Sequence, residues 1–144
     1  MATYPIYTAT GYRFETIPDL RDLGTRERLS QSAMDGFIAI SKKWGLSGEQ
    51  QGELLGGVPR SSLYKLKTAA GTLQYDQLTR ISYIVAIYKD LHILLPQDLA
   101  DRWIIRPNDN VLFSGHAPLE YVLRAGIPGL QQVRGLLDAM RGGL

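Results

Sequence analysis

A positively charged stretch rich in hydroxyl side chains lies near the middle of this 144-residue chain. No acidic residue occurs between Glu53 and Asp76, although the formal net charge of the whole chain is only +2. Lysine and arginine neutralise phosphate charge, and short polar side chains hydrogen-bond to phosphate oxygens or base edges. The candidate contacts are Arg60, Ser61, Ser62, Tyr64, Lys65, Lys67 and Thr68. This combination indicates a nucleic-acid-binding surface.

A short helix and a glycine turn are expected just before this stretch. Ser47 and Gln50 fit a capping box, in which each side chain satisfies a free backbone N–H at the start of a helix. Gly56 and Gly57 end that helix, because glycine adopts the left-handed backbone of a tight turn without a Cβ clash. The position of Gln50 near the start of the helix makes it a further candidate for contact with a DNA phosphate.

A second helix is predicted over about residues 59–69, with Pro59 in its first turn. Leu63 and Leu66 form its buried side. Its outer strip consists of Ser61, Lys65 and Thr68. Together the two helices predict a helix-turn-helix, which lays its second helix in the DNA major groove. The alternative is that these cations only solvate an outer helix face, and the paired glycines leave the register of the turn open by one residue.

Apolar residues recur at helical spacing through the rest of the chain, which predicts an all-α fold. A helix from about Thr25 to Trp44 and a longer one from about Tyr75 to Leu95 flank the helix-turn-helix. The longer helix is apolar over more than one face, so we expect it to be packed on both sides. A second copy of the chain would cover part of that surface, which predicts a homodimer.

The C-terminal part is predicted to contain shorter helices punctuated by proline and glycine. We expect one over 99–105, one from Pro118 to Gly126, and a last one from Pro128. The apolar stripe of the last helix comprises Leu130, Val133, Leu137 and Met140. Gly142, Gly143 and Leu144 would then form a short flexible tail.

Residues with other chemistry do not form a recognisable catalytic set. The chain has no cysteine, and its two histidines, His92 and His116, are far apart in the sequence. Neither lies beside a recognisable nucleophile, so we expect solvated or structural histidines, no metal, no cofactor and no enzyme activity. Trp44 and Trp103 end apolar helical stripes, which favours core packing over stacking on bases.

The first residues resemble neither a secretion signal nor a membrane span. Residues 1–24 contain charged residues and lack a continuous apolar stretch, and their threonine, tyrosine and proline content predicts an extended arm. No other segment is long and apolar enough to span a bilayer. We therefore expect a cytoplasmic protein with an arm (1–24), a helix-turn-helix and dimerisation domain (25–90) and a C-terminal domain (91–144).

The C-terminal half also resembles a known family. Its spaced residues are Trp103, Pro107-Asn108, Phe113-Ser114-Gly115, Pro118-Leu119-Glu120, Gly126, Val133 and Leu137. This pattern resembles the toxin-binding domain of the Xre/MbcA/ParS antitoxins, and residues 28–90 resemble the Xre-like helix-turn-helix that precedes it. The resemblance covers all but about the first two dozen residues.

The resemblance implies a partner and no catalytic activity in this chain. Toxins of this family resemble RES-domain proteins, which destroy NAD, and the antitoxin would block the toxin while the complex represses its own operon. The end of the last helix is the candidate blocking element. Its candidate toxin contacts are Arg134, Asp138, Arg141, Gly142, Gly143 and Leu144. Here the terminal carboxylate would imitate an anionic part of the toxin's substrate.

The main alternative is a stand-alone helix-turn-helix regulator whose C-terminal domain senses a small ligand or an unrelated protein. The presence of a toxin gene beside this one would separate the two interpretations. An enzyme is disfavoured, because the sequence contains no paired catalytic carboxylates, phosphate-binding glycine loop or nucleophile with its base.

Overall fold

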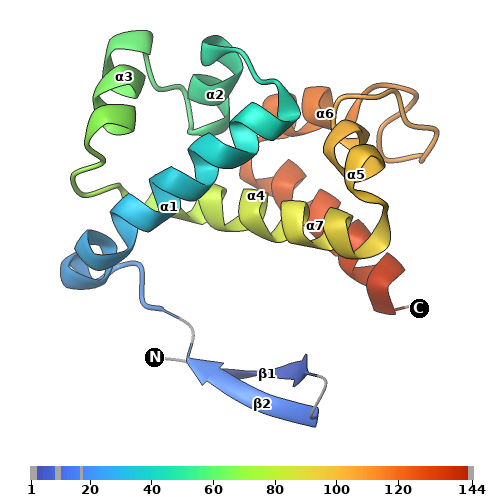
Figure 1. The fold of residues 1–144 in the computed structure, drawn as a ribbon, viewed down its shortest axis with the longest axis horizontal. Coiled ribbons are helices and arrows are strands. Elements are labelled where there is room, and N and C mark those ends of the chain that lie inside the picture. Colours follow the sequence, from blue (N-terminus) through green and yellow to red (C-terminus); the bar gives the residue numbers. More distant parts are fainter. Residues whose placement is uncertain (1–2, 9–10, 17, 143–144) are drawn as a thin grey trace.

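The computed structural model describes residues 3–8, 11–16 and 18–142 (Figure 1). Its helical part confirms the predicted all-α fold, and a small hairpin precedes it. The helices are α1 (Leu23–Trp44), α2 (Gly48–Leu54), α3 (Arg60–Thr68), α4 (Tyr75–Leu94), α5 (Gln97–Trp103), α6 (Pro118–Ala125) and α7 (Ile127–Gly142). Among these helices, none combines the length and the apolar character needed to cross a lipid bilayer.

The expected N-terminal arm contains an antiparallel hairpin of β1 (Thr3–Thr8) and β2 (Gly11–Thr16). Its backbone is extended, as predicted, but the pairing of the arm with itself was not predicted from the sequence. Helix α1 begins shortly after it, because the Asp22 carboxylate caps the backbone N–H of Thr25 at 2.9 Å. The helix therefore starts two residues before the predicted Thr25.

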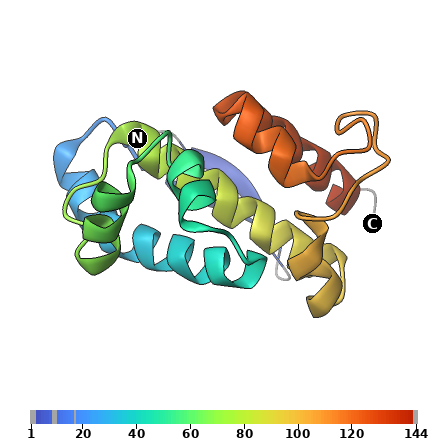
Figure 2. The same ribbon diagram turned by 90° about the horizontal axis from the view of Figure 1, so that it is seen from above.

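Helix α4 is the central element of the fold. Figure 2 shows it lying between α1 on one side and α7 on the other. Its buried apolar residues are Leu78, Ile81, Ile84, Ile87 and Leu91. The prediction that α4 is packed on both sides is confirmed, but α7 of the same chain supplies the second layer. Much of the surface assigned to a second copy is therefore covered within one chain.

The predicted helix-turn-helix is formed by α2 and α3. Ser47 and Gln50 make the expected capping box, with the Ser47 hydroxyl accepting from the Gln50 N–H at 3.1 Å. Gly56 and Gly57 have φ values of 96° and 93°, which non-glycine residues rarely adopt. The carbonyl of Gly52 accepts two N–H groups of the turn, from Gly57 and Val58, each at 2.9 Å. These bonds fix the position of α3 relative to α2.

Helices α5 to α7 occur where proline and glycine residues predict them, although some of their ends differ from the predicted positions. Helix α5 starts two residues before the expected position, because Pro96 caps it, and it ends at Trp103. Gly126 ends α6 with φ 65°, as expected for a glycine terminator. The core contains Leu130, Val133 and Leu137 of α7.

Two predictions about the end of α7 were wrong. Met140 is not part of the buried stripe, because its side chain is 46% exposed. Gly142 belongs to the helix and not to a tail. Gly143 and Leu144 lie outside the described residues. Helix α7 thus carries its charged last turn on a continuous helical backbone.

Candidate functional site

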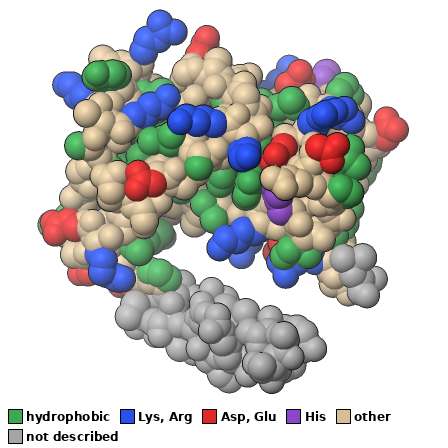
Figure 3. All heavy atoms as spheres, in the orientation of Figure 1, with side chains coloured by type: hydrophobic (Ala, Val, Ile, Leu, Met, Phe, Trp, Pro, Cys, Tyr) green, Lys and Arg blue, Asp and Glu red, His purple; other side chains and the backbone are tan. Residues whose placement is uncertain are grey.

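The exposed face of α3 brings the predicted nucleic-acid contacts together. Leu63 is 3% exposed and anchors the helix in the core, while Leu66 is half-buried. All the candidate side chains of this helix are exposed: Arg60, Ser61, Ser62, Tyr64, Lys65, Lys67 and Thr68. Figure 3 shows lysine and arginine side chains spread over the corner of the molecule that α3 occupies. This face is cationic, and its side chains are not packed in the core.

Local hydrogen bonds restrict what two of the candidates can offer a ligand. The Thr68 hydroxyl donates to the Tyr64 carbonyl at 2.8 Å, so it remains available mainly as an acceptor. The Gln50 carbonyl oxygen accepts from the Ser47 N–H at 2.9 Å. The amide nitrogen of Gln50 is therefore the group that can donate to a phosphate.

The acidic boundary of the cationic stretch is neutralised in the fold. Asp76, in the first turn of α4, accepts from the Arg80 Nε at 2.8 Å. This pair packs against Gly56, where an added Cβ would meet the Asp76 carboxylate at 3.0 Å. Asp76 therefore contributes little net negative charge near α3.

Hydrogen bonds to α1 hold the segment after α3. The Ser30 hydroxyl accepts from the Leu73 N–H at 2.8 Å and donates to the Arg26 carbonyl at 2.6 Å. Ser30 is fully buried, so these bonds satisfy a polar group that would otherwise be costly. They fix the path of the chain from α3 into α4.

The last turns of α7 form a second polar cluster, which faces α4. Arg141 donates to Asp90 of α4 at 2.6 Å, and Arg134 lies 3.6 Å from Asp138 along the same face of α7. The Arg134 guanidinium also lies over the Tyr83 ring at 5.8 Å. Arg134, Asp138 and Arg141 are thus brought together on α7, and their side chains are 44%, 50% and 45% exposed.

Asp90 is the residue of this cluster that the sequence analysis missed. It is 2% exposed, and one of its carboxylate oxygens accepts from no N–H group or hydroxyl of the described residues. A signal was present in the sequence, because an aspartate stands directly before the buried Leu91 on a helix whose neighbouring turns are apolar. A buried carboxylate needs a charged or hydrogen-bonding partner, and Arg141 supplies one.

The carboxyl group of Asp138, which neighbours Asp90, has a raised pKa. A hydrogen bond with Asp90, assisted by burial, raises the pKa of Asp138 from 3.8 to about 6. Arg134 and Arg141 act in the opposite direction. Two carboxyl oxygens that face each other can form a hydrogen bond only when one of them carries a proton.

The tryptophans and histidines have structural positions in the described chain. Trp44 is 3% exposed and belongs to the core. Trp103 is half-buried and meets Phe113 edge to face, with 5.7 Å between the ring centroids. His92 lies 3.0 Å from Asp101 of α5, and no group of residues suited to a metal ion was found among the described residues.

His116 lies in the segment before α6. Its Nδ1 is 3.1 Å from Glu120, and both side chains are more than half exposed. Such an exposed pair agrees with the expectation of a solvated histidine.

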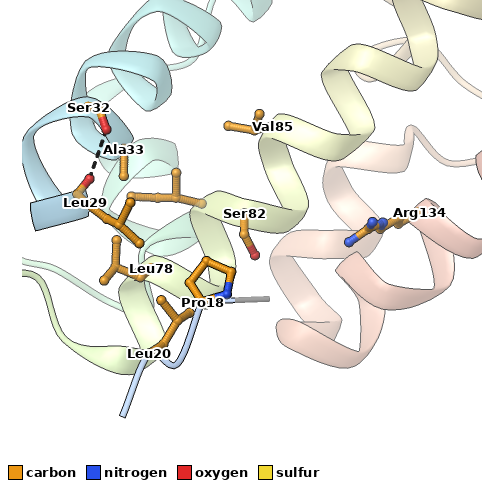
Figure 4. A pocket seen from close by; sticks show the side chains of 10 residues that line it. Pro18, Leu20, Leu29, Ser32, Ala33, Leu78, Ser82, Val85 and Arg134 are labelled. Atoms are coloured by element: carbon orange, nitrogen blue, oxygen red, sulfur yellow. Dashed lines mark hydrogen bonds between the residues drawn. The ribbon is translucent and has the colours of Figure 1, made fainter. Parts of the chain in front are cut away.

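An apolar groove of about 650 Å³ remains between α1 and α4. Figure 4 shows Leu29 and Ala33 of α1 facing Leu78 and Val85 of α4, with Arg134 of α7 at the far edge. Pro18 and Leu20, in the segment before α1, also line the groove.

Two family models match successive parts of the chain. Residues 25–86 match the antitoxin Xre-like helix-turn-helix domain, and residues 90–143 match the antitoxin Xre/MbcA/ParS C-terminal toxin-binding domain. A Sinorhizobium fredii (strain NBRC 101917 / NGR234) protein described as "Uncharacterized protein y4oB" is 41% identical over 111 residues, which cover 76% of this chain and 84% of that protein.

These matches and the fold define a two-part DNA-binding antitoxin, with a helix-turn-helix followed by a toxin-binding domain. The chain belongs to the Xre/MbcA/ParS antitoxin family.

Proposed function

We propose that this chain neutralises a RES-type toxin that degrades NAD, and that it represses its own operon by binding operator DNA. The observation that carries the proposal is the separation of two exposed charged surfaces on one helical body. Figure 1 places α3 and the C-terminal end of α7 at opposite ends of that body. A single antitoxin molecule can therefore bind DNA and a toxin without either partner blocking the other.

For DNA, we propose that α3 enters the major groove. Its exposed hydroxyl groups at Ser61 and Ser62 lie at the start of the helix, where short side chains can approach base edges. Lys65 and Lys67, in the last turn, would neutralise backbone phosphates. The Gln50 amide nitrogen would donate to a phosphate at the edge of the same site.

For the toxin, we propose that the last turns of α7 block the active site. Arg134 and Arg141 have side chains that are 44% and 45% exposed, so both can pair with acidic or phosphate-reading groups of a nucleotide cleft. Asp138 lies beside them, and Gly142 adds little bulk at the end of the helix. Gly143 and Leu144 remain part of the proposal, although they lie outside the described residues.

We also propose that two copies pair through the groove between α1 and α4. The groove lining is mainly apolar, including Leu29, Leu78 and Val85, and a matching face on a second copy would remove that surface from water. A two-fold dimer presents two α3 helices to a palindromic operator, which raises affinity beyond that of one helix. Cytoplasmic location follows from the same function, because both the operator and NAD are found there.

Co-expression with the adjacent gene tests the toxin part of the proposal. We expect the adjacent gene alone to stop growth and deplete cellular NAD, and the full chain to restore both. A chain ending at Met140 lacks Arg141 and the residues after it, so it should lose most of this protection. The control Arg106→Ala removes a cation outside α7 and should protect like the unaltered chain.

Two results would contradict this proposal in different ways. Full protection by the shortened chain would show that the end of α7 is not the blocking element. Failure of the full chain to restore growth, or to bind the adjacent gene product, would favour a stand-alone regulator.

A further inference from the structure

The polar cluster between α4 and α7 contains more than an ion pair. Ser82, Lys89 and Asp90 of α4 and Arg134, Asp138 and Arg141 of α7 line a hollow of about 270 Å³. Asp90 lies at its buried end, with an exposed fraction of only 2%. No charged side chain of α1 or α5 is among the described residues that line the hollow. On α4, His92 pairs with Asp101 and so is directed to α5.

The two carboxylate oxygens of Asp90 have different surroundings. One oxygen, Oδ1, accepts from the Arg141 guanidinium at 2.6 Å. The other, Oδ2, is buried, and no N–H group or hydroxyl of the described residues donates to it. An unpaired buried acceptor of this kind is costly, and a protonated carboxyl group on Asp138 is the donor that the cluster can supply.

We propose that Asp90 is a positioning residue, which shares a proton with Asp138 while it holds Arg141, and so fixes the charged last turn of α7 against α4. Asp90 itself is too buried to contact a large partner. Arg141 and Asp138 both contact Asp90 and both reach the surface. The protonation of the Asp90–Asp138 pair therefore determines how these two side chains are presented to a partner. The importance of this arrangement for toxin binding rests on the proposed function, whereas the arrangement itself does not.

The direction of the pH dependence follows from the pKa of Asp138, which is raised from 3.8 to about 6. Between these two values the folded protein holds a proton that the unfolded chain releases. The stabilising effect of the shared proton is therefore fully present below 3.8 and is lost as the pH rises through about 6. Above that pH, Arg134 and Arg141 must offset two facing negative charges.

Carboxyl-carbon NMR titration of the free, full-length protein tests the shared proton. In the unaltered chain we expect Asp138 to titrate near pH 6. Asp90→Asn removes the facing charge and should lower the pKa of Asp138 towards its ordinary value. Arg141→Gln removes a cation that lowers this pKa, so it should shift the titration upwards. If Asp90 and Arg141 had only packing roles, the two substitutions would not shift the pKa of Asp138 in opposite directions.

Amide exchange in the last turn of α7 tests the positioning role. After correction for the intrinsic exchange rate, protection of this turn should fall severalfold between pH 5 and pH 7.5 in the unaltered chain. Asp138→Asn can donate to Asp90 at every pH, so it should remove this change. The control Glu120→Gln alters an exposed carboxylate on α6 and should keep it.

Several outcomes would overturn the proposal. These are an Asp138 titration near 3.8 in the unaltered chain, no shift in Asp90→Asn, or the same pH-dependent exchange in Asp138→Asn as in the unaltered chain. If the free protein behaves as expected but binds no toxin at any pH, the proposed function fails while the proton-sharing pair stands.

Discussion

At the scale of single residues, α3 separates its anchoring residue from its proposed DNA-binding residues. Leu63 is buried, whereas Lys65 and Lys67 are exposed and make no hydrogen bond or ion pair with another described side chain. Thr68, by contrast, uses its hydroxyl proton within the helix. The lysines are therefore the residues of α3 whose removal should alter binding to a polyanion while leaving the fold intact.

The salt dependence of DNA binding tests these lysines. Each phosphate contact adds about 0.9 to the slope of log affinity against log salt concentration. We expect Lys65→Ala and Lys67→Ala each to lower the slope by about that amount, and the double variant by about twice as much. Fluorescence anisotropy with the chain's own promoter fragment, over about 50–200 mM salt, measures it.

Arg106→Ala is the matched control for the two lysine variants. Arg106 is also exposed, but it follows α5, at the other end of the body from α3. Arg106→Ala removes one positive charge, as each lysine variant does, and should leave the slope of log affinity against log salt concentration unchanged. Equal slopes for the lysine variants and the unaltered chain would exclude α3 as the phosphate-binding helix.

The cationic surface of α3 could be predicted from the sequence, whereas the polar cluster between α4 and α7 could be predicted only in part. The exposure of Lys65 and Lys67 follows from local helical spacing around Leu63, which the sequence displays directly. The contact of Asp90 with Arg141 joins residues 51 positions apart and depends on how α4 and α7 pack. Spacing along one helix contains no information about that packing.

At the scale of elements, the turn between α2 and α3 depends on a close backbone approach at Gly52. A Cβ on Gly52 would meet the Val58 carbonyl oxygen at 2.3 Å, which no side-chain rearrangement can relieve. The sequence predicts a turn at Gly56 and Gly57, and their positive φ values confirm that part. The requirement at Gly52 is set by the distance between two segments, so it did not emerge from turn chemistry.

Gly52→Ala and Gly48→Ala compare two glycines of the same helix. We expect Gly52→Ala to lower the free energy of unfolding by about 1–3 kcal/mol, because the turn must move to admit the methyl group. Gly48 has open space around its Cβ position, so Gly48→Ala should be neutral or stabilise by a few tenths of a kcal/mol. Urea unfolding followed by circular dichroism measures both, and equal stabilities would contradict the close approach.

Helix starts were predicted best where a single side chain or proline defines them. Ser47 and Pro118 begin α2 and α6 as expected. Helix α5 began early because Pro96 was treated as the end of α4 and not as the cap of the next helix. Met140 was misplaced because the apolar stripe of α7 continues in the sequence beyond the part of α4 that covers it.

At the scale of the whole molecule, α4 belongs to both halves of the antitoxin. It packs against α1 of the helix-turn-helix part and against α7 of the toxin-binding part (Figure 2). The predicted division at residue 90 falls inside this helix. One continuous helix thus joins the two parts, and the groove beside it is the apolar surface through which we propose that two copies pair.

Ala33→Lys tests pairing through that groove. Ala33 lies in the groove and is half-buried, so a lysine there would place a charge in the proposed apolar interface. We expect the unaltered chain of 16.0 kDa to have about twice that mass in light scattering at micromolar concentration, and Ala33→Lys to raise the dimer dissociation constant at least tenfold. Its affinity for a palindromic operator should fall as well, since two α3 helices would no longer be linked.

Ala39→Lys is the control on the same helix. Ala39 is exposed and is not among the groove residues, so the same substitution there should leave the dimer and its operator affinity unchanged. A monomeric unaltered chain at micromolar concentration would refute the dimer. A dimer equally stable in both variants would instead place the interface elsewhere, because a lysine ammonium cannot be buried in an apolar contact without a large loss of affinity.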